Sequence, residues 1–383
     1  MIDRILRSNE ALFAAMDEIV TMEAAEEAMR LIGDCRAPSQ FSRFTRGKVI
    51  KQLAKAYGML DSGKAVFHMN HLGTGNCAIS TGRRTPKPIM FLAHLDEVSY
   101  AIQVKVGIGR YKLAPLCYHM IREGSRPAVA LRFRGTDVEV AARGELVSED
   151  NGRAIYFQTD NDSLQRGVRV CFESRVEIDS SDWTIHGSVD DAFAVAAQVL
   201  TSAVLARLGM DSITVLTDEE EGVTDAGNLS FCKGGARLFN RTPKSELPDL
   251  VVVSDIHESD NMRDGAGSSV RPGDGACFAE VSSWGRGEVV PPHLFEFERE
   301  LGQALKQYNI SLLENPDGYV SRSDGVSAMT FTPNVMTVGF LGRDRHFTKI
   351  PSANLKDLVH LAKSLCVYAA FAHDDEWRSA YLG

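Results

Sequence analysis

The chain has 383 residues, of which 44% are hydrophobic and 24% are charged, as in a globular protein large enough for two domains. Its formal net charge of -9 argues against a protein that binds nucleic acids or membrane surfaces through general electrostatic attraction. The seven cysteines are scattered and form no Cys-x-x-Cys pair, which argues against a disulfide framework and a thiolate zinc site. Because we find neither a secretory signal nor a run that could span a bilayer, we expect a cytoplasmic protein.

The predicted elements alternate between helices and strands. Residues 8–33 and 41–58 have apolar side chains at helical spacing, and so do residues 192–209 and 355–371. Four short apolar runs are typical of buried parallel strands: "PIMFLA" (88–93), "ITVLT" (213–217), "DLVVVS" (249–254) and "VMTVGFL" (335–341). This alternation predicts an α/β domain whose mostly parallel sheet is sandwiched by helices.

The segment 100–186 interrupts the alternation. Its short runs, such as "AVALRFRG" and "GVRVCFESRVEI", are rich in β-branched residues and are separated by Gly and Asp. We therefore expect an inserted all-β, barrel-like domain over 100–186. The α/β domain is then discontinuous and consists of residues 1–99 and 187–383.

Ionisable side chains follow the predicted strands where each strand ends, or precede a helix. These residues are His94, Asp96, Asp190, Asp191, Glu219, Glu220, Asp255 and His346. Because ligands bind outside the carboxyl ends of parallel strands, most of these side chains are expected at one edge of the sheet. Each alone has an ordinary explanation, such as a structural histidine, a solvated acidic turn or a helix cap. Gathered together, the carboxylates would repel one another unless cations neutralised them.

The residue types indicate which cations would bind. Two histidines with several carboxylates suit zinc, cobalt or manganese rather than calcium. Two such ions that share a carboxylate lower the pKa of a bridging water and polarise a scissile carbonyl. A neighbouring carboxylate that does not bind metal can then act as general base.

The order of the motifs resembles the two-metal aminopeptidases of the M42 family, the glutamyl aminopeptidase and tetrahedral aminopeptidase group. The motifs are His-x-Asp at 94–96, Asp-Asp before a helix, Asp-Glu-Glu-x-Gly, a strand that ends in Asp, and a late His. The resemblance runs from about residue 88 to the C-terminus. The β-rich segment between His94 and Asp190 distinguishes this arrangement from the M20 carboxypeptidases and deacylases, which keep those two ligands close.

The resemblance implies a role for each of these residues. It implies five ligands for two divalent ions: His94, Asp190, Glu220, Asp255 and His346. His94 and Asp255 would hold one ion, Glu220 and His346 the other, and Asp190 rather than Asp191 would bridge both. Glu219 would be the general base that activates the bridging water. Asp96 would orient the imidazole of His94.

The triple glutamate allows two registers. Aligning Gly222 with the glycine of the family motif makes Glu219 the base and Glu220 the ligand. A shift by one residue makes Glu220 the base and Glu221 the ligand, and this alternative stays open.

The expected activity is the removal of N-terminal residues from peptides with two divalent ions, zinc first and cobalt or manganese as alternatives. An amidase or deacylase acting on N-acyl amino acids or small amides would use the same machinery, and a non-catalytic scaffold is a third hypothesis. The resemblance also implies a homo-oligomer, often of twelve subunits, built with the inserted domain, which lines access to the site. We expect no nucleic-acid or membrane partner.

Four further predictions concern segments near the site. Residues 232–248 are expected to form a surface loop, and residues 265–270 a flexible one. His257 is expected to be an ordinary loop residue. Asp324 is either a site residue or a helix cap.

Overall fold

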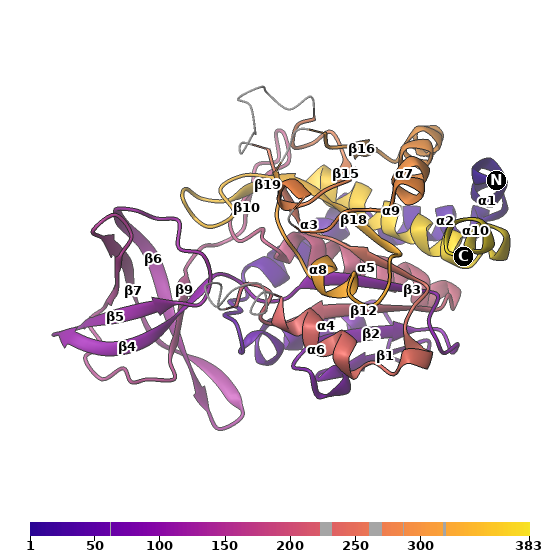
Figure 1. Ribbon diagram of the computed structural model, residues 1–383. Coiled ribbons are helices and arrows are strands. Elements are labelled where there is room, and N and C mark those ends of the chain that lie inside the picture. The colour runs from indigo at the N-terminus through magenta and orange to yellow at the C-terminus, as the bar shows by residue number, and fades with distance from the viewer. Residues whose placement is uncertain (62, 223–231, 260–269, 286, 317–318) are drawn as a thin grey trace.

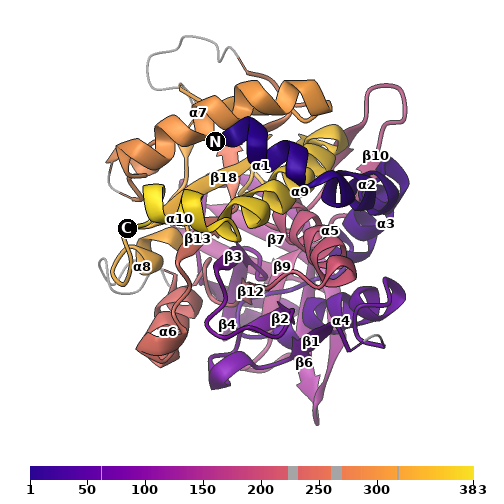
Figure 2. The same ribbon diagram turned by 90° about the vertical axis from the view of Figure 1, so that its right-hand side faces the viewer.

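The computed structural model of the chain describes residues 1–61, 63–222, 232–259, 270–285, 287–316 and 319–383. Figure 1 shows an α/β body with a β-barrel at one end and both termini at the other. Figure 2 looks from the end that carries the termini, so that the barrel lies behind the body. Among the described residues, no helix combines the length and the apolar character needed to cross a bilayer.

A ten-stranded mixed sheet forms the centre of the body. Along its main path the strands are β1 (Ala65–His68), β2 (Cys77–Thr81), β12 (Ser212–Thr217), β3 (Ile89–His94), β13 (Leu250–Val253), β18 (Val335–Gly342), β14 (Ile256–Glu258) and β17 (Tyr319–Val320). Two more strands, β15 (Ala276–Phe278) and β16 (Leu312–Glu314), continue from β18. The central pairs β12–β3, β3–β13, β13–β18 and β18–β14 are parallel. The predicted α/β class is confirmed.

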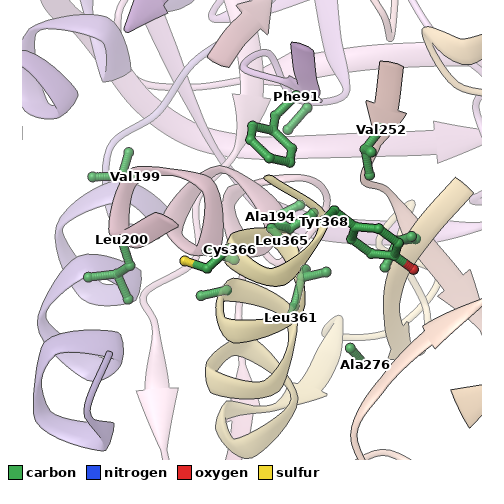
Figure 3. Close-up of a cluster of buried hydrophobic side chains, with 14 of the residues drawn as sticks. Phe91, Ala194, Val199, Leu200, Val252, Ala276, Leu361, Leu365, Cys366 and Tyr368 are labelled. Carbon is green, nitrogen blue, oxygen red and sulfur yellow. The ribbon is translucent and has the colours of Figure 1, made fainter. Parts of the chain in front are cut away.

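Helices cover both faces of this sheet (Figure 1). They are α1 (Ile2–Ser8), α2 (Glu10–Ile19), α3 (Met22–Gly33), α4 (Arg46–Ala56), α5 (Ala192–Leu208), α6 (Lys233–Arg241), α7 (Pro292–Leu305), α8 (Gly325–Ala328), α9 (Leu355–Ala372) and α10 (Asp375–Tyr381). Alternate residues of β3 enter two different cores, because successive side chains of a strand point to opposite faces. Phe91 packs with the large core of α3, α5 and α9, whereas Met90 and Leu92 pack with the smaller core of α6. Figure 3 shows Phe91 and Val252 above the helices of the large core.

The inserted segment forms a closed barrel. Its strands are β4 (Ser99–Gly107), β5 (Arg110–Pro115), β6 (Gly124–Arg134), β7 (Asp137–Glu149), β8 (Ala154–Gln158) and β9 (Arg169–Phe172). Phe347, from the C-terminal part of the chain, joins the barrel core and stacks on Phe172 with ring centroids 4.4 Å apart. The body and the barrel therefore share an apolar contact.

The barrel strands stop before residue 186. The next strands, β10 (Glu177–Ile178) and β11 (Thr184–His186), pair with each other, and β11 pairs on its other side with β19 (Ser352–Asn354). An alternating β pattern does not reveal which sheet a strand joins, so this change of partner was not visible in the sequence. The division into 1–99 plus 187–383 and 100–186 stays a prediction.

Two predicted segments differ from the structure. The single helix expected over 8–33 is divided before α3, where the Thr21 hydroxyl accepts a hydrogen bond from the Ala24 N–H and so caps a new helix. The surface loop expected over 232–248 was wrong, because it contains helix α6. Leu238 and Phe239 of α6 are buried against the sheet, which stabilises a helix there. Of the loop expected over 265–270, residues 265–269 lie outside the described residues.

Candidate metal centre

Three parallel strands end at the same edge of the sheet and carry ionisable residues to it. His94, the last residue of β3, lies opposite Thr217, the last residue of β12. On the other side, β13 pairs with β3 as far as Val253, two residues before Asp255. The acidic turn after Thr217 and the segment around Asp255 therefore flank His94, at the edge where the carboxyl ends of the parallel strands meet.

Asp190 lies at the centre of the ligand-bearing residues. Its Oδ1 atom is 2.9 Å from Nε2 of His94. Ligand atoms of His94, Asp190 and Glu221 all lie within 4.8 Å of one another, and so do those of Asp190, Asp191 and Asp255. The structure thus brings together three of the predicted ligands, with Asp190 common to both groups.

A third group surrounds His346. Ligand atoms of Cys117, Glu221 and His346 also lie within 4.8 Å of one another. Nε2 of His346 is 3.8 Å from Oε2 of Glu221, and Sγ of Cys117 is 2.5 Å from the same oxygen. Glu221 therefore connects the histidine of the late loop to the group around Asp190.

The other two glutamates of the acidic turn have different surroundings. The Glu219 carboxylate forms an ion pair with Arg237, with an N–O distance of 2.5 Å, and accepts a hydrogen bond of 3.1 Å from Gln40. The Glu220 carboxylate is buried and accepts a hydrogen bond of 3.3 Å from the Cys232 thiol. Among the described residues, neither Glu219 nor Glu220 is part of the three ligand groups.

Asp96 contacts His94 mainly through its backbone. Nδ1 of His94 is 3.0 Å from the main-chain oxygen of Asp96 and 3.8 Å from the carboxylate. That carboxylate accepts hydrogen bonds from the Ser39 hydroxyl, at 2.6 Å, and from the Glu220 N–H, at 3.1 Å. A backbone carbonyl can orient a ligating imidazole as well as a carboxylate can. The Asp96 side chain instead fixes the acidic turn beside β3.

Burial and mutual repulsion oppose the ionisation of several carboxylates of the centre. Burial, together with the charge of Asp190, raises the pKa of Glu221 to about 7. Burial and neighbouring carboxylates also raise the pKa values of Asp191 and Asp255 well above the usual range. Without a cation this site would bind protons at pH values where ordinary carboxylates are ionised.

The two histidines of the centre differ in their electrostatic surroundings. Burial opposes protonation of His94, but the hydrogen bond to Asp190 and the charge of Glu220 raise its pKa well above the usual value. Burial, together with the charge of Arg345, lowers the pKa of His346 to about 4. A neutral imidazole such as that of His346 is the form that binds metal.

Several polar atoms of the centre lack protein partners. Within the described part of the chain, Oδ1 of Asp191, Oε1 of Glu221 and Nε2 of His346 are buried and have no hydrogen-bond partner. Unsatisfied buried acceptors are rare in folded proteins, and a bound ion is one recognised explanation. The residues present, two histidines, several carboxylates and a thiol, fit a divalent transition metal.

Two further residues discussed from the sequence have structural surroundings. His257 lies in β14 rather than in a loop, is fully buried beside Cys277, and has a pKa lowered to about 3 by burial. Asp324 accepts hydrogen bonds from the Thr217 hydroxyl and from the Gly235 N–H in the first turn of α6. Asp324 is the N-cap residue of α8 but makes no capping hydrogen bond there with its side chain, which instead holds the first turn of α6 beside β12.

Two residues of the ligand groups, Glu221 and Cys117, were not among the five ligands predicted from the sequence. Glu221 was only the alternative ligand, because the register was set by Gly222. Cys117 was set aside because the scattered cysteines, with no Cys-x-x-Cys pair, argued against a thiolate zinc site.

Comparison with known proteins gives matches at the level of structure only. No sequence family and no curated protein matches the chain. The aminopeptidase APDkam598 from the archaeon Desulfurococcus kamchatkensis superimposes with a TM-score of 0.71 and 18% identity, over 94% of this chain and 98% of that one. A TET aminopeptidase from the marine sediment archaeon Thaumarchaeota archaeon SCGC AB-539-E09 has a TM-score of 0.70 and 13% identity, over 94% and 99%. For the Pyrococcus horikoshii TET1 peptidase the TM-score is 0.67 with 14% identity, over 90% and 99%. The chain therefore has the fold of the TET aminopeptidases.

Proposed function

We propose that the chain is a metal-dependent aminopeptidase of the M42 type. The observation that carries this proposal is the sharing of buried carboxylates: Asp190 and Glu221 each belong to two of the three ligand groups. Carboxylates shared between adjacent ligand groups suit a pair of divalent ions. We propose zinc as the resident ion, with cobalt or manganese as functional substitutes. The residues that would hold the ions are His94, Asp190, Asp255, Glu221 and His346.

When bound, the ions would supply Lewis acidity that polarises the substrate carbonyl and makes a water acidic enough to attack it at neutral pH. The chain's own residues then have to move protons. A general base near the cluster takes the proton of the attacking water and delivers it to the leaving amine.

We propose the shifted register of the acidic turn, with Glu220 as general base and Glu221 as metal ligand. Glu221 is supported as ligand because its carboxylate is part of two of the ligand groups. Glu220 is supported as base because it is buried and its charge acts on His94. Glu219 is the weaker candidate, since its carboxylate is paired with Arg237.

Three single variants test the register: Glu219→Gln, Glu220→Gln and Glu221→Gln. We expect Glu220→Gln to retain its metal and lose about 100- to 10,000-fold in kcat, as the loss of a general base does. Glu221→Gln should lose metal, measured by elemental analysis of the purified protein. Loss of kcat with full metal content in Glu219→Gln, and loss of metal in Glu220→Gln, would restore the first register.

The substrate class needs a separate test, because an amidase or deacylase would use the same residues. A panel of aminoacyl reporters with free and with acylated amines distinguishes the two. We expect cleavage of the free-amine reporters. Cleavage of acylated reporters alone would make the chain a deacylase, and cleavage of neither by the metal-loaded protein would favour a non-catalytic scaffold.

We also propose that the chain forms homo-oligomers in the cytoplasm. The similar Pyrococcus horikoshii TET1 peptidase assembles into a tetrahedron or a large octahedral shell. In this chain the barrel strand β4 and the turn after it expose Val104, Val106 and Ile108, the last with 94% of its surface accessible. The cytoplasmic location is supported by the seven cysteines, all of which are free thiols. Light scattering of the purified protein would test assembly, and a monomer would contradict it.

A further inference from the structure

A connecting segment of the barrel reaches the metal centre. Cys117 lies between β5 and β6 and is only 5% exposed. Its Sγ atom is 2.5 Å from Oε2 of Glu221, and both share a ligand group with His346. The centre therefore contains a side chain from the barrel as well as those from the sheet edge.

The residue after Cys117 orients the histidine of the same group. The main-chain oxygen of Tyr118 lies 3.2 Å from Nδ1 of His346. A metal-ligating histidine typically donates its other N–H to a carbonyl or carboxylate, which fixes the direction of the free nitrogen. Here the free nitrogen is Nε2, which is buried, lies 3.8 Å from Glu221, and has no hydrogen-bond partner. This unpartnered nitrogen does not depend on Cys117, and it indicates independently that an ion binds here.

The barrel holds this segment in place at several points. The Leu116 N–H donates to the Ser99 oxygen at 2.9 Å. His119 lies within hydrogen-bond distance of the Tyr100 hydroxyl, at 2.8 Å, and of the Ser148 hydroxyl, at 3.0 Å. Ligands that are fixed by their surroundings bind metal without the cost of being ordered first. The position of Cys117 is thus set by the barrel.

We propose that Cys117 is a metal ligand, whose sulfur completes with Glu221 and His346 the protein ligands of one divalent ion. Three protein ligands with a fourth position open to water or substrate are the pattern of catalytic zinc sites. When the ion binds, the S–H bond is replaced by a metal–sulfur bond and the proton is released to solvent. A thiolate makes this position softer than one built from oxygen and nitrogen, so it selects zinc over manganese.

This inference rests on the proposed function, because it assigns a residue to the ions proposed there. It adds a ligand that the motif order did not include and that comes from the inserted segment. It also means that the barrel and the α/β body are joined through the ion, so metal binding should stabilise their contact.

X-ray absorption at the zinc edge of the full-length, zinc-loaded protein tests the proposal. We expect a sulfur neighbour at about 2.3 Å in the wild type. Cys117→Ser should remove the sulfur signal and weaken zinc binding at least about 10-fold. Cys117→Asp keeps an anionic ligand, so it should retain more zinc than Cys117→Ser while also lacking the sulfur signal. This comparison distinguishes loss of the ligand from misfolding.

Cys232→Ser is the matched control. Cys232 is another buried cysteine next to the acidic turn, 3.3 Å from Glu220, and lies in none of the ligand groups. We expect its zinc spectrum to keep the sulfur neighbour. Loss of the sulfur signal in Cys232→Ser with retention in Cys117→Ser would overturn the assignment. Bound zinc and peptide cleavage without any sulfur neighbour would overturn it while leaving the proposed function intact, whereas a protein that binds no zinc would overturn both.

Discussion

Two groups of buried charged side chains near the end of β3, one around Glu97 and one around Asp190, differ in how their carboxylates are neutralised. Glu97 is 3% exposed, and its carboxylate lies 3.4 Å from both Arg36 and Arg46 and accepts hydrogen bonds from the Ala37 N–H and the Ser188 hydroxyl. Burial alone would raise the pKa of Glu97, but the two arginines lower it below its usual value. This carboxylate is neutralised by the protein.

The carboxylates around Asp190 are equally buried but less fully neutralised, because the charges of His94 and Arg345 lower the pKa values of Glu221 and Asp255 less than burial raises them. Glu221 and Asp191 each have an oxygen without a hydrogen-bond partner in the described part of the chain. Burial raises the pKa of Glu221 to about 7, in the opposite direction to that of Glu97. The charge of Glu97 is balanced by arginines of the protein. The charges around Asp190 would be balanced only when a cation binds.

Replacing the shared carboxylate should have the largest effect. Asp190→Asn removes one charge from two ligand groups, so we expect loss of bound metal and of detectable peptide cleavage. Burial alone would raise the pKa of Asp190, but its hydrogen bond to His94 lowers it, so the variant also loses a favourable buried pair. The metal-free variant should therefore unfold at a lower temperature than the metal-free wild type. Elemental analysis and thermal unfolding measure the two effects. Normal metal content in this variant would contradict the account.

Glu97→Gln should lower the stability without affecting metal binding. Removing one partner of a buried charge pair leaves Arg46 buried without its counter-charge, which typically costs about 3–5 kcal/mol of unfolding free energy. Metal content of the folded variant should not change. Urea unfolding of the metal-free protein gives the stability, and a change below about 1 kcal/mol would show that Glu97 is not needed for charge balance.

The contributions of Glu97 and Glu221 to the stability of the fold should change with pH in opposite directions. The folded-state pKa of Glu97 is lowered, so its contribution to stability is present above the unfolded value of about 4.3 and is lost as the pH falls below it. The folded-state pKa of Glu221 is raised to about 7, so its contribution is present below about pH 4.3 and is lost as the pH rises through 7. Between pH 5 and pH 8 only the second effect operates.

We therefore expect the metal-free protein to have a lower Tm at pH 8 than at pH 5, and zinc to raise the Tm more at pH 8. Scanning calorimetry of stripped and zinc-loaded protein measures this, with Glu221→Gln as the variant in which the difference shrinks. An equal zinc-induced shift at both pH values would speak against a cation that relieves carboxylate repulsion.

Ser188→Ala should have the smallest effect. It removes one hydrogen bond of 3.0 Å to a carboxylate that keeps both arginines. Hydrogen bonds to charged groups contribute about 1.5–3 kcal/mol, so we expect a loss at the lower end of that range. Chemical unfolding with Glu97→Gln as reference measures it. A loss equal to that of Glu97→Gln would show that the serine, and not the arginines, stabilises the ionised carboxylate.

The sequence predicted the sheet edge better than the orientation of the side chains there. Short apolar runs located β3, β12, β13 and β18, and the rule that ligands bind at the carboxyl ends of parallel strands predicted that His94 and Asp255 lie at one edge. The structure adds the order of the strands, in which β13 pairs with β3. The register of the acidic turn could not be predicted from Gly222, because the direction of each glutamate depends on the backbone. Glu219 has a φ of 65°, in the left-handed region, which changes where the following residues point.

Contacts between segments that are distant in the sequence were the second feature that could not be predicted. Cys117 approaches Glu221 only because the barrel connection is folded against the body, and no local pattern encodes that approach. Helix α6 was missed for a related reason, since the buried environment of Leu238 and Phe239 is created by the sheet. Local periodicity carries no information on such long-range packing.

The central claim is that the cluster around Asp190 holds divalent ions that drive removal of N-terminal residues. It is tested most directly by the rate at which an aminoacyl reporter is cleaved by the metal-stripped protein during titration with zinc. We predict no cleavage before zinc is added and a rise that saturates near two equivalents per chain, with no cleavage of the N-acylated reporter. Full activity in the stripped protein, or a rate that does not respond to zinc, cobalt or manganese, would contradict the claim.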